Sequence, residues 1–271
     1  MKIKSNIVCD YIAGKSILSY KEEWFFRAEG YSFEEPSYEA EHKEAVGRIC
    51  KLIIDSVKDF YPCNVSIWDA LFPTWRHILE DITINLIIGF PEPNDATVLK
   101  SPDGQYNVLL DLGLWAKYEG KCDIASVVHN LLTHELCHVC ISKTIAGIDD
   151  DIDHGDYISQ LDAHTFHEGF AHLVSYDDKD INEVDWNSEK LQQAKYRSIE
   201  MMKLAITSSD RTEQKAYLHN AIYGDYYDKY ACMCGMFYLV DCWKNNNIPG
   251  IVEEFRKGYK GFSKRTIVNY K

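Results

Sequence analysis

The chain has 271 residues, of which 46% are hydrophobic, and it carries a formal charge of −13 with a pI near 5.2. This length can bury a substantial core, as one unit of two lobes or as two small domains, and the negative charge argues against nucleic acid as a partner. No run of about eighteen apolar residues occurs and no apolar stretch of signal-peptide length opens the chain, so we expect a soluble, cytoplasmic protein without a membrane partner.

The first predicted elements are a helix and two strands. Apolar residues at helical spacing predict a helix over residues 38–60, with Pro62 at its end. The segment 81–90 alternates and is rich in β-branched residues, and the segment 106–113 reads as a second strand after a turn. An edge strand beside a cleft can pair with an extended substrate backbone, and we expect residues 106–113 to form that edge. An ordinary core strand explains this segment equally well.

The next predicted helix carries the most informative motif of the chain. The run 123–133 contains neither glycine nor proline, its apolar residues repeat at helical spacing, and Asp123 is placed to cap it. The helix continues into His134-Glu135-Leu136-Cys137-His138, which has the pattern H-E-x-x-H. Histidines four residues apart lie on one helix face and can share one Zn²⁺, while Glu135 reaches a water molecule rather than the metal. Chance alone gives this pattern in on the order of a few per cent of such chains, so the helical context favours a zinc site.

A catalytic zinc ion needs a third protein ligand, and the sequence offers two candidates. The first is Glu168, at the centre of a second predicted helix over residues 162–175. His164 and His172 stand four residues before and after it. The neighbouring Gly169 is small enough to let this helix approach the first one closely.

The second candidate is His154, which lies in the acidic segment 149–156. This segment lacks the glycine and glutamate that an EF-hand loop requires at its sixth and twelfth positions. We therefore expect a solvated loop near the cleft, and calcium binding or a preference for basic substrates is the alternative.

The two motifs together resemble those of the gluzincin metallopeptidases, the thermolysin-like and aminopeptidase-like clan. His134, Glu135 and His138 match the H-E-x-x-H motif, and Glu168-Gly169-Phe170-Ala171 matches the E-G-x-A motif that follows about thirty residues later. The resemblance implies that His134, His138 and Glu168 bind one zinc ion per chain and that Glu135 is the catalytic base. It extends over roughly residues 80 to 260 in the order of elements, although its specific motifs cover only about ten residues. His172 departs from the pattern, because thermolysin-like enzymes have an aspartate there that steadies a metal-bound histidine.

A competing resemblance is to the SprT-like proteases, in which H-E-x-x-H is followed by H-G-x-x-[FY] and the histidine of the second motif is the third ligand. His154-Gly155-Asp156-Tyr157 is similar to that motif, with the aromatic residue displaced. SprT-like enzymes act on DNA-bound proteins and carry basic surfaces, whereas this chain is acidic. We therefore favour Glu168 over His154.

The implied reaction is metal-assisted hydrolysis of an amide in a peptide or protein substrate. Glu135 would take a proton from the attacking water and pass it to the leaving amine. A second donor to the oxyanion is usual in such sites, and we select Tyr230. Its rivals are Tyr223, Tyr226, Tyr227 and His172, and packing against the core is the alternative role for each tyrosine.

A rival of a different class is a non-catalytic zinc-binding or interaction protein of the same fold. The presence of Glu135 between the two histidines weakly favours the enzyme, because a scaffold would have no chemical need for that carboxylate. The sequence carries no signal for an oligomeric state or for endopeptidase against exopeptidase action.

The remaining elements are helical. Helices are predicted over residues 188–207 and from about 225 to 243, and Pro249 opens a last one. The expected fold is α+β and zincin-like. A mixed α/β lobe over residues 1–145 would hold an edge strand followed by the H-E-x-x-H helix, and a mainly helical lobe over residues 146–271 would carry the third ligand.

The nine cysteines, an odd number, fit a reducing compartment. Four of them are expected to act as small buried hydrophobes: Cys137, Cys140, Cys232 and Cys234.

Overall fold

The computed structural model describes residues 1–268 and Tyr270, and the chain divides into two compact units. The first unit comprises Met1–Pro62 and Thr74–Val139, and the second comprises Cys63–Pro73 and Cys140–Lys271. The described elements combine a four-stranded sheet with helices, so the fold class is α+β, as expected. The division between the units lies within the H-E-x-x-H helix, and a short internal segment of the chain belongs to the second unit.

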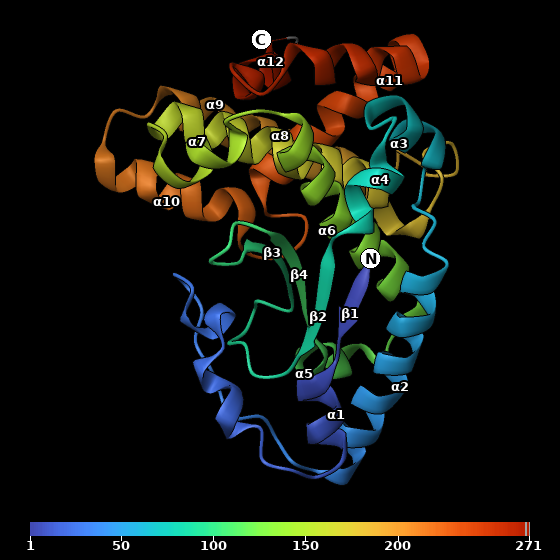
Figure 1. Cartoon of the computed structure of the whole chain (residues 1–271). Helices are drawn as coiled ribbons and strands as arrows, with labels where there is room; N and C mark the ends of the chain where they lie inside the picture. Colours follow the sequence, from blue (N-terminus) through green and yellow to red (C-terminus); the bar gives the residue numbers. More distant parts are fainter. Residues whose placement is uncertain (269, 271) are drawn as a thin grey trace. The chain divides into compact units, whose positions relative to one another are not determined.

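The sheet of the first unit has the strand order β1-β2-β4-β3 (Figure 1). β1 (Lys2–Lys4), β2 (Thr83–Ile87) and β4 (Tyr106–Asp111) are parallel, and β3 (Ala96–Lys100) pairs antiparallel with β4. The expectation that residues 106–113 form the edge is therefore wrong, because β4 lies between two strands. Its buried run from residue 107 to 111 suits a strand covered on both faces, whereas β3 is half exposed and forms the edge.

Short helices and one long helix complete the part of the first unit that precedes the H-E-x-x-H helix. The predicted helix over residues 38–60 is α2 (Ala40–Lys58), and its apolar face is buried. The others are α1 (Asn6–Ile12), η1 (Leu18–Glu22), η2 (Trp24–Arg27), α4 (Trp75–Glu80), α5 (Leu112–Trp115) and η3 (Ala116–Tyr118).

The buried carboxylate of Asp111 connects the end of β4 to α5. It accepts hydrogen bonds from the backbone N–H groups of Gly89, Phe90 and Leu114 at 2.7, 2.7 and 3.0 Å. Burial raises the pKa of Asp111 to about 6, although these hydrogen bonds oppose the rise. This aspartate therefore holds the chain where it leaves two neighbouring strands.

The H-E-x-x-H helix is α6 (Ile124–Thr144). Asp123 caps it as predicted, since its Oδ1 accepts from the Ala125 N–H at 3.0 Å and its Oδ2 accepts from the Ser126 hydroxyl at 3.2 Å. By length and composition alone α6 could cross a membrane, but half of its most apolar window is buried in the fold. The core helix of a globular protein meets the same criteria.

The described elements of the second unit are helical. The predicted second motif helix is α8 (Tyr157–Ser175), and the predicted helix over residues 188–207 is α9 (Glu189–Thr207). α11 (Tyr230–Lys257) contains a kink at Asn246 and Asn247, where φ and ψ are not helical, just before Pro249. The remaining helices are α3 (Val65–Leu71), α7 (Ile148–His154), η4 (Tyr176–Asp178), α10 (Arg211–Ile222) and α12 (Phe262–Ile267).

α8 and α11 cross with their backbones in contact. A Cβ atom placed on Gly169 would lie 2.8 Å from the Gly235 Cα, and one placed on Gly235 would lie 2.5 Å from the Thr165 carbonyl oxygen. No side chain larger than hydrogen fits at either position without a shift of backbone. Gly169 was expected to let α8 approach the H-E-x-x-H helix, but the backbone that Gly169 contacts is that of α11.

The acidic segment 149–156 is mostly helical, and the expectation of a loop is wrong. Asp149, Asp150 and Asp151 occupy the first turn of α7, where the helix dipole favours negative charge. Asp149 accepts from the Ser142 hydroxyl at 2.7 Å, and Asp151 accepts from the Tyr259 hydroxyl at 2.7 Å and pairs with Lys260. Side chains of other segments therefore satisfy these two carboxylates.

Candidate metal centre

His134 and His138 lie on one face of α6, and their ring nitrogens point at each other. The two Nε2 atoms are 3.0 Å apart, and the ring planes are nearly perpendicular at 87°. Two nitrogens bound to one tetrahedral zinc at Zn–N distances of about 2.0–2.1 Å would be about 3.3 Å apart. The pair therefore fits two ligands of one zinc ion with little adjustment.

Glu135 is adjacent to His134 in the sequence, but its side chain leaves the helix in a different direction from the two histidines. Its side chain is almost completely buried, with 6% of the residue exposed. Successive residues on an α-helix differ by about 100° in direction, so Glu135 does not lie in the row that contains the two histidines. A buried carboxylate beside a histidine pair suits a general base.

Glu168 and His172 are neighbouring side chains on α8 of the second unit, and both are of types that can bind a metal. His172 Nδ1 lies 3.0 Å from the Glu168 carbonyl oxygen and 3.3 Å from Glu168 Oε2. Both acceptors are oxygens, so Nδ1 carries the proton in the neutral ring and Nε2 is the acceptor nitrogen. His172 is buried, and the Glu168 side chain is 21% exposed.

His164 stands one turn before Glu168 on the same helix. Burial lowers the pKa of His164 below its ordinary value, and the negative charges of Glu168 and Asp153 partly oppose that change. The imidazole is therefore kept neutral near pH 7.

His154, the alternative third ligand, is the last residue of α7 and is exposed. The residues after it have local structural roles. Asp156 caps α8 through a 2.8 Å hydrogen bond from the Ser159 N–H, and a Cβ on Gly155 would lie 2.5 Å from the Asp151 carbonyl oxygen. The junction between α7 and α8 therefore explains why the sequence His154-Gly155-Asp156 occurs here, without invoking a role in metal binding.

Tyr230, the selected oxyanion donor, is the first residue of α11 and is buried in the core of the second unit with Leu161 and Met202. Its hydroxyl donates to the Tyr217 carbonyl oxygen at 3.0 Å. Among the tyrosines near α8, Tyr226 is 41% exposed, and its ring centroid lies 5.3 Å from that of His172. These positions favour a packing role for Tyr230.

Sequence reasoning missed one neighbour of Glu168. The thiol of Cys232, on α11, lies 3.8 Å from Glu168 Oε2. All nine cysteines are free thiols, and the four expected to be buried are buried. In the sequence, the one feature that could have drawn attention to Cys232 is its position one helical turn before Gly235.

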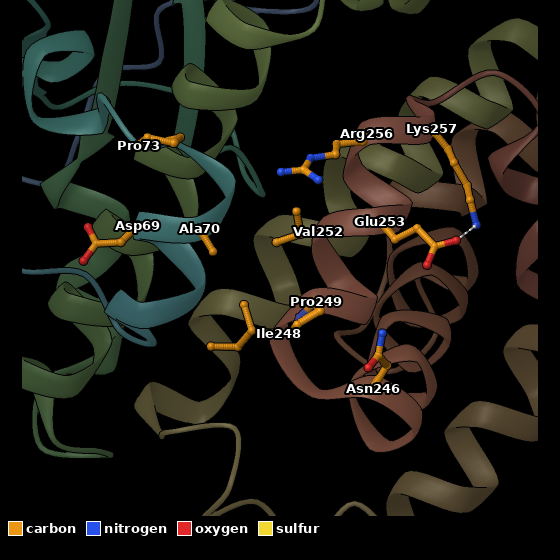
Figure 2. Close-up of a pocket in the computed structure, with 10 residues that line it drawn as sticks. All are labelled: Asp69, Ala70, Pro73, Asn246, Ile248, Pro249, Val252, Glu253, Arg256 and Lys257. Carbon is orange, nitrogen blue, oxygen red and sulfur yellow. Dashed lines mark ion pairs between the residues drawn. The ribbon is translucent and has the colours of Figure 1, made fainter.

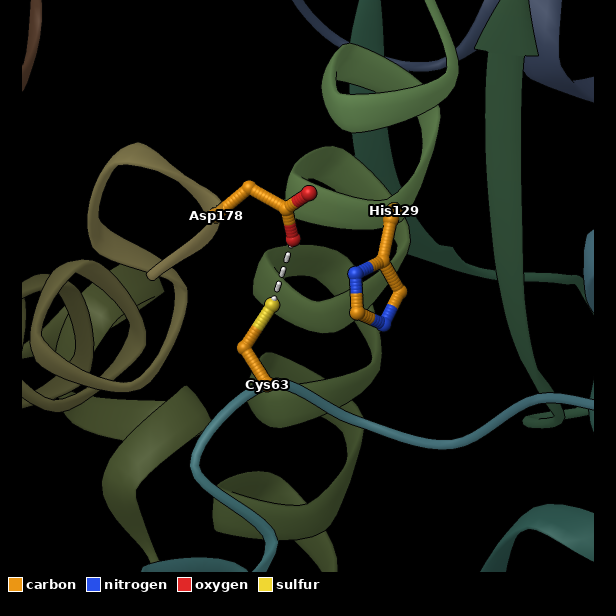
Figure 3. A group of neighbouring side chains, drawn as sticks. All are labelled: Cys63, His129 and Asp178. Atoms are coloured by element: carbon orange, nitrogen blue, oxygen red, sulfur yellow. Dashed lines mark hydrogen bonds between the residues drawn. The ribbon is translucent and has the colours of Figure 1, made fainter. Parts of the chain in front are cut away.

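A second cysteine has a carboxylate partner elsewhere in the second unit. The Cys63 thiol donates to Asp178 Oδ1 at 2.9 Å (Figure 3). The adjacent Asn64 donates to the carbonyl oxygens of Val174 and Lys179 at 3.1 and 3.0 Å and accepts from the Ile181 N–H at 2.7 Å. These bonds attach segment 63–73 to the end of α8 and the turn after it.

A cavity of about 840 Å³ also lies in the second unit (Figure 2). Its walls are α3 with Pro73 and the part of α11 that follows the kink, and they are largely apolar. Glu253 and Lys257, which line it, form an ion pair at 2.8 Å. Neither Glu168 nor His172 lines this cavity, so it is separate from these two side chains of α8.

One comparison with known proteins gives a match. Residues 66–240 match the model of the DUF5700 family, whose description is "putative zinc dependent peptidase". No curated protein and no solved structure was found to match the chain. The matched stretch covers more than half of the chain and includes the histidine pair, Glu135 and Glu168. The chain therefore belongs to the DUF5700 family.

Proposed function

We propose that the protein is a gluzincin-type metallopeptidase that hydrolyses peptide bonds with one zinc ion per chain. His134, His138 and Glu168 would hold the metal, and Glu135 would be the general base. The observation that carries the proposal is the 3.0 Å approach of the two Nε2 atoms on α6, beside a buried carboxylate. Membership of a family described by zinc dependence supports it.

Contacts within the second unit support Glu168 as the third ligand. Ser142, in the last turn of α6, lies 3.2 Å from the Nε2 of His167 on α8. Ser142 follows His138 by four residues on the same face of a continuous helix. Within the second unit, the last turn of α6 therefore contacts α8 at the residue before Glu168.

The chain's own residues would perform the proton transfers. When bound, zinc would polarise the substrate carbonyl and lower the pKa of a water molecule towards about 7. The Glu135 carboxylate would accept the proton of the attacking water and deliver it to the leaving amine nitrogen. Tyr226 beside His172 is better placed than Tyr230 as a donor to the oxyanion, because the Tyr230 hydroxyl already donates within the core.

β3 is the strand we propose to pair with an extended substrate, in place of residues 106–113. It has β4 on one side, and no other described strand pairs with it. Backbone groups on an open strand edge can bind a peptide by adding a strand. β3 belongs to the same unit as the histidine pair, as the zincin-like fold that we propose requires.

One observation favours a second candidate function. The Nδ1 of His172 is engaged with the Glu168 carbonyl oxygen, so Nε2 is the nitrogen with a lone pair for a metal. A zinc ion held by two histidines of α6, Glu168 and His172 would have four protein ligands. Such closed sites are structural, and the protein would then be a non-catalytic zinc-binding protein.

Metal content and peptide hydrolysis test the proposal together. Wild type should bind one zinc ion, Glu135→Gln should keep the metal and lose hydrolysis, and Glu168→Ala should weaken metal binding far more than His154→Ala. Metal lost from His154→Ala and kept by Glu168→Ala would instead support the SprT-like ligand set. Zinc-loaded wild type that cleaves no member of a diverse peptide library would favour the closed structural site.

A further inference from the structure

We infer that Cys232 is a positioning residue that orients the Glu168 carboxylate for metal binding. The inference rests on the proposed function, because it takes Glu168 as a zinc ligand. It assigns a role to a buried thiol for which the peptidase reaction itself has no use.

Two side chains from different helices approach one oxygen of Glu168. The Cys232 thiol donates to Oε2 at 3.8 Å, and the His172 Nδ1, which is hydrogen-bonded to the Glu168 carbonyl oxygen, lies 3.3 Å from the same Oε2. Residues that hold a metal-binding carboxylate fix its rotation about the side chain and so reduce the entropy lost when the metal binds. Because Cys232 is on α11, the carboxylate is held from outside its own helix.

The thiol has two acceptors within reach. The Ala221 carbonyl oxygen lies 3.5 Å from the Cys232 Sγ, and the residue is completely buried. A thiol has one hydrogen, and an ionised carboxylate attracts it more strongly than a neutral carbonyl. The hydrogen is therefore directed to Glu168, and burial among the core side chains keeps the sulfur in place.

The glycine crossing of α8 and α11 explains why a cysteine occupies this position. Glu168 directly precedes Gly169, and Cys232 lies one turn before Gly235, so both side chains emerge where the backbones touch. At this short separation a small side chain reaches the carboxylate. A longer donor such as glutamine or lysine would require the helices to move apart.

Cys234 provides a matched control on the same helix. It is as deeply buried as Cys232, but its thiol lies 3.2 Å from the Thr266 Oγ1 and makes no described contact with Glu168. Replacement of either thiol by alanine removes the same atoms from the core of the second unit.

The experiment measures zinc affinity by competition with a chromogenic chelator for purified wild type and for Cys232→Ala, Cys232→Ser and Cys234→Ala. Loss of a residue that supports a metal ligand typically weakens binding by about 10–100-fold, and because a thiol is a weak donor we expect about 10-fold for Cys232→Ala. Serine should restore most of the affinity, and Cys234→Ala should bind like wild type. The absorption spectrum of the Co²⁺-substituted protein should change in Cys232→Ala and in no other cysteine variant.

The outcomes separate this inference from the proposed function on which it rests. Wild-type affinity in Cys232→Ala, together with weak binding in Glu168→Ala, would overturn the positioning role and leave the ligand set intact. An equal loss in Cys232→Ala and Cys234→Ala would also overturn it, since general loosening of the core would then explain both. Unchanged zinc binding in Glu168→Ala would overturn the ligand assignment and the positioning role together.

Discussion

The contact between α8 and α11 predicts that Gly235→Ala destabilises the second unit. In most helices this change is favourable, because alanine gains about 1 kcal/mol over glycine in helix propensity. Here the new Cβ would lie 2.5 Å from the Thr165 carbonyl oxygen and 2.9 Å from the Gly169 Cα. Both obstructing atoms belong to the backbone of α8, so no side-chain rotation can relieve the overlap.

The change in the free energy of unfolding is the difference between the cost of the steric overlap and the gain in helix propensity. Forcing extra volume into a packed contact typically costs about 1–3 kcal/mol, and a backbone obstacle places this site towards the upper end. After subtraction of the propensity gain of about 1 kcal/mol, the free energy of unfolding should fall by about 2 kcal/mol. Urea unfolding followed by circular dichroism, with a separate transition fitted for each unit, measures the change.

Gly47→Ala is the control, because it makes the same substitution in a helix without a close neighbour. Gly47 lies within α2, and a Cβ placed there would have the Ile12 Cδ1 as its nearest atom at 3.7 Å, an ordinary contact distance. This variant should gain about 0.5–1 kcal/mol. If Gly235→Ala were as stable as the wild type, or gained as much as Gly47→Ala, the backbone contact between α8 and α11 would be refuted.

Three further predictions concern single polar side chains. Asn64→Ala should lower the stability of the second unit by roughly 2–4 kcal/mol in urea unfolding, because three backbone groups lose their partner and two of these hydrogen bonds are buried. For Asp111, whose pKa is raised to about 6 by burial, the native state binds the proton more tightly than the unfolded state, so wild type should lose stability relative to Asp111→Asn as the pH rises from about 4 to 7. A difference between the two proteins that stays constant over this range would contradict the raised pKa. Tyr230→Phe should lower stability by about 1 kcal/mol and leave kcat for peptide hydrolysis unchanged, whereas a loss of kcat without a loss of stability would restore Tyr230 as an oxyanion donor.

Elements defined by local patterns could be predicted from the sequence. The cap at Asp123 and the unbroken apolar spacing after it gave the start of α6 to the residue, and the same reasoning located α2 and α9. The histidine pair also follows from local geometry, because residues four apart on a helix must lie on one face. These features depend on interactions within about one helical turn.

Features that depend on distant segments were not predictable in this way. β4 lies between β2 and β3, and these two strands come from separate parts of the sequence. The amino-acid pattern of residues 106–113 does not reveal which strands pair with it, so the sequence did not distinguish an edge strand from a central one. The acidic segment resembled a solvated loop because the partners of Asp151, Tyr259 and Lys260, lie near the other end of the chain. Cys232 looked like an ordinary core residue for the same reason, since its approach to Glu168 depends on the crossing of two helices.

The assignment of residues 63–73 to the second unit has a consequence for how the protein is made. The chain passes from one unit to the other at residues 62, 73 and 139, so neither unit is a continuous stretch of sequence. During synthesis, the apolar side chains of segment 63–73 must wait for partners such as Phe255, whose ring centroid lies 5.2 Å from that of Phe72, the residue after α3. Truncation after residue 145 would leave this segment permanently without those partners. The second unit can therefore not be completed before the ribosome has passed α11, and in a fragment that ends earlier this unit is not expected to fold.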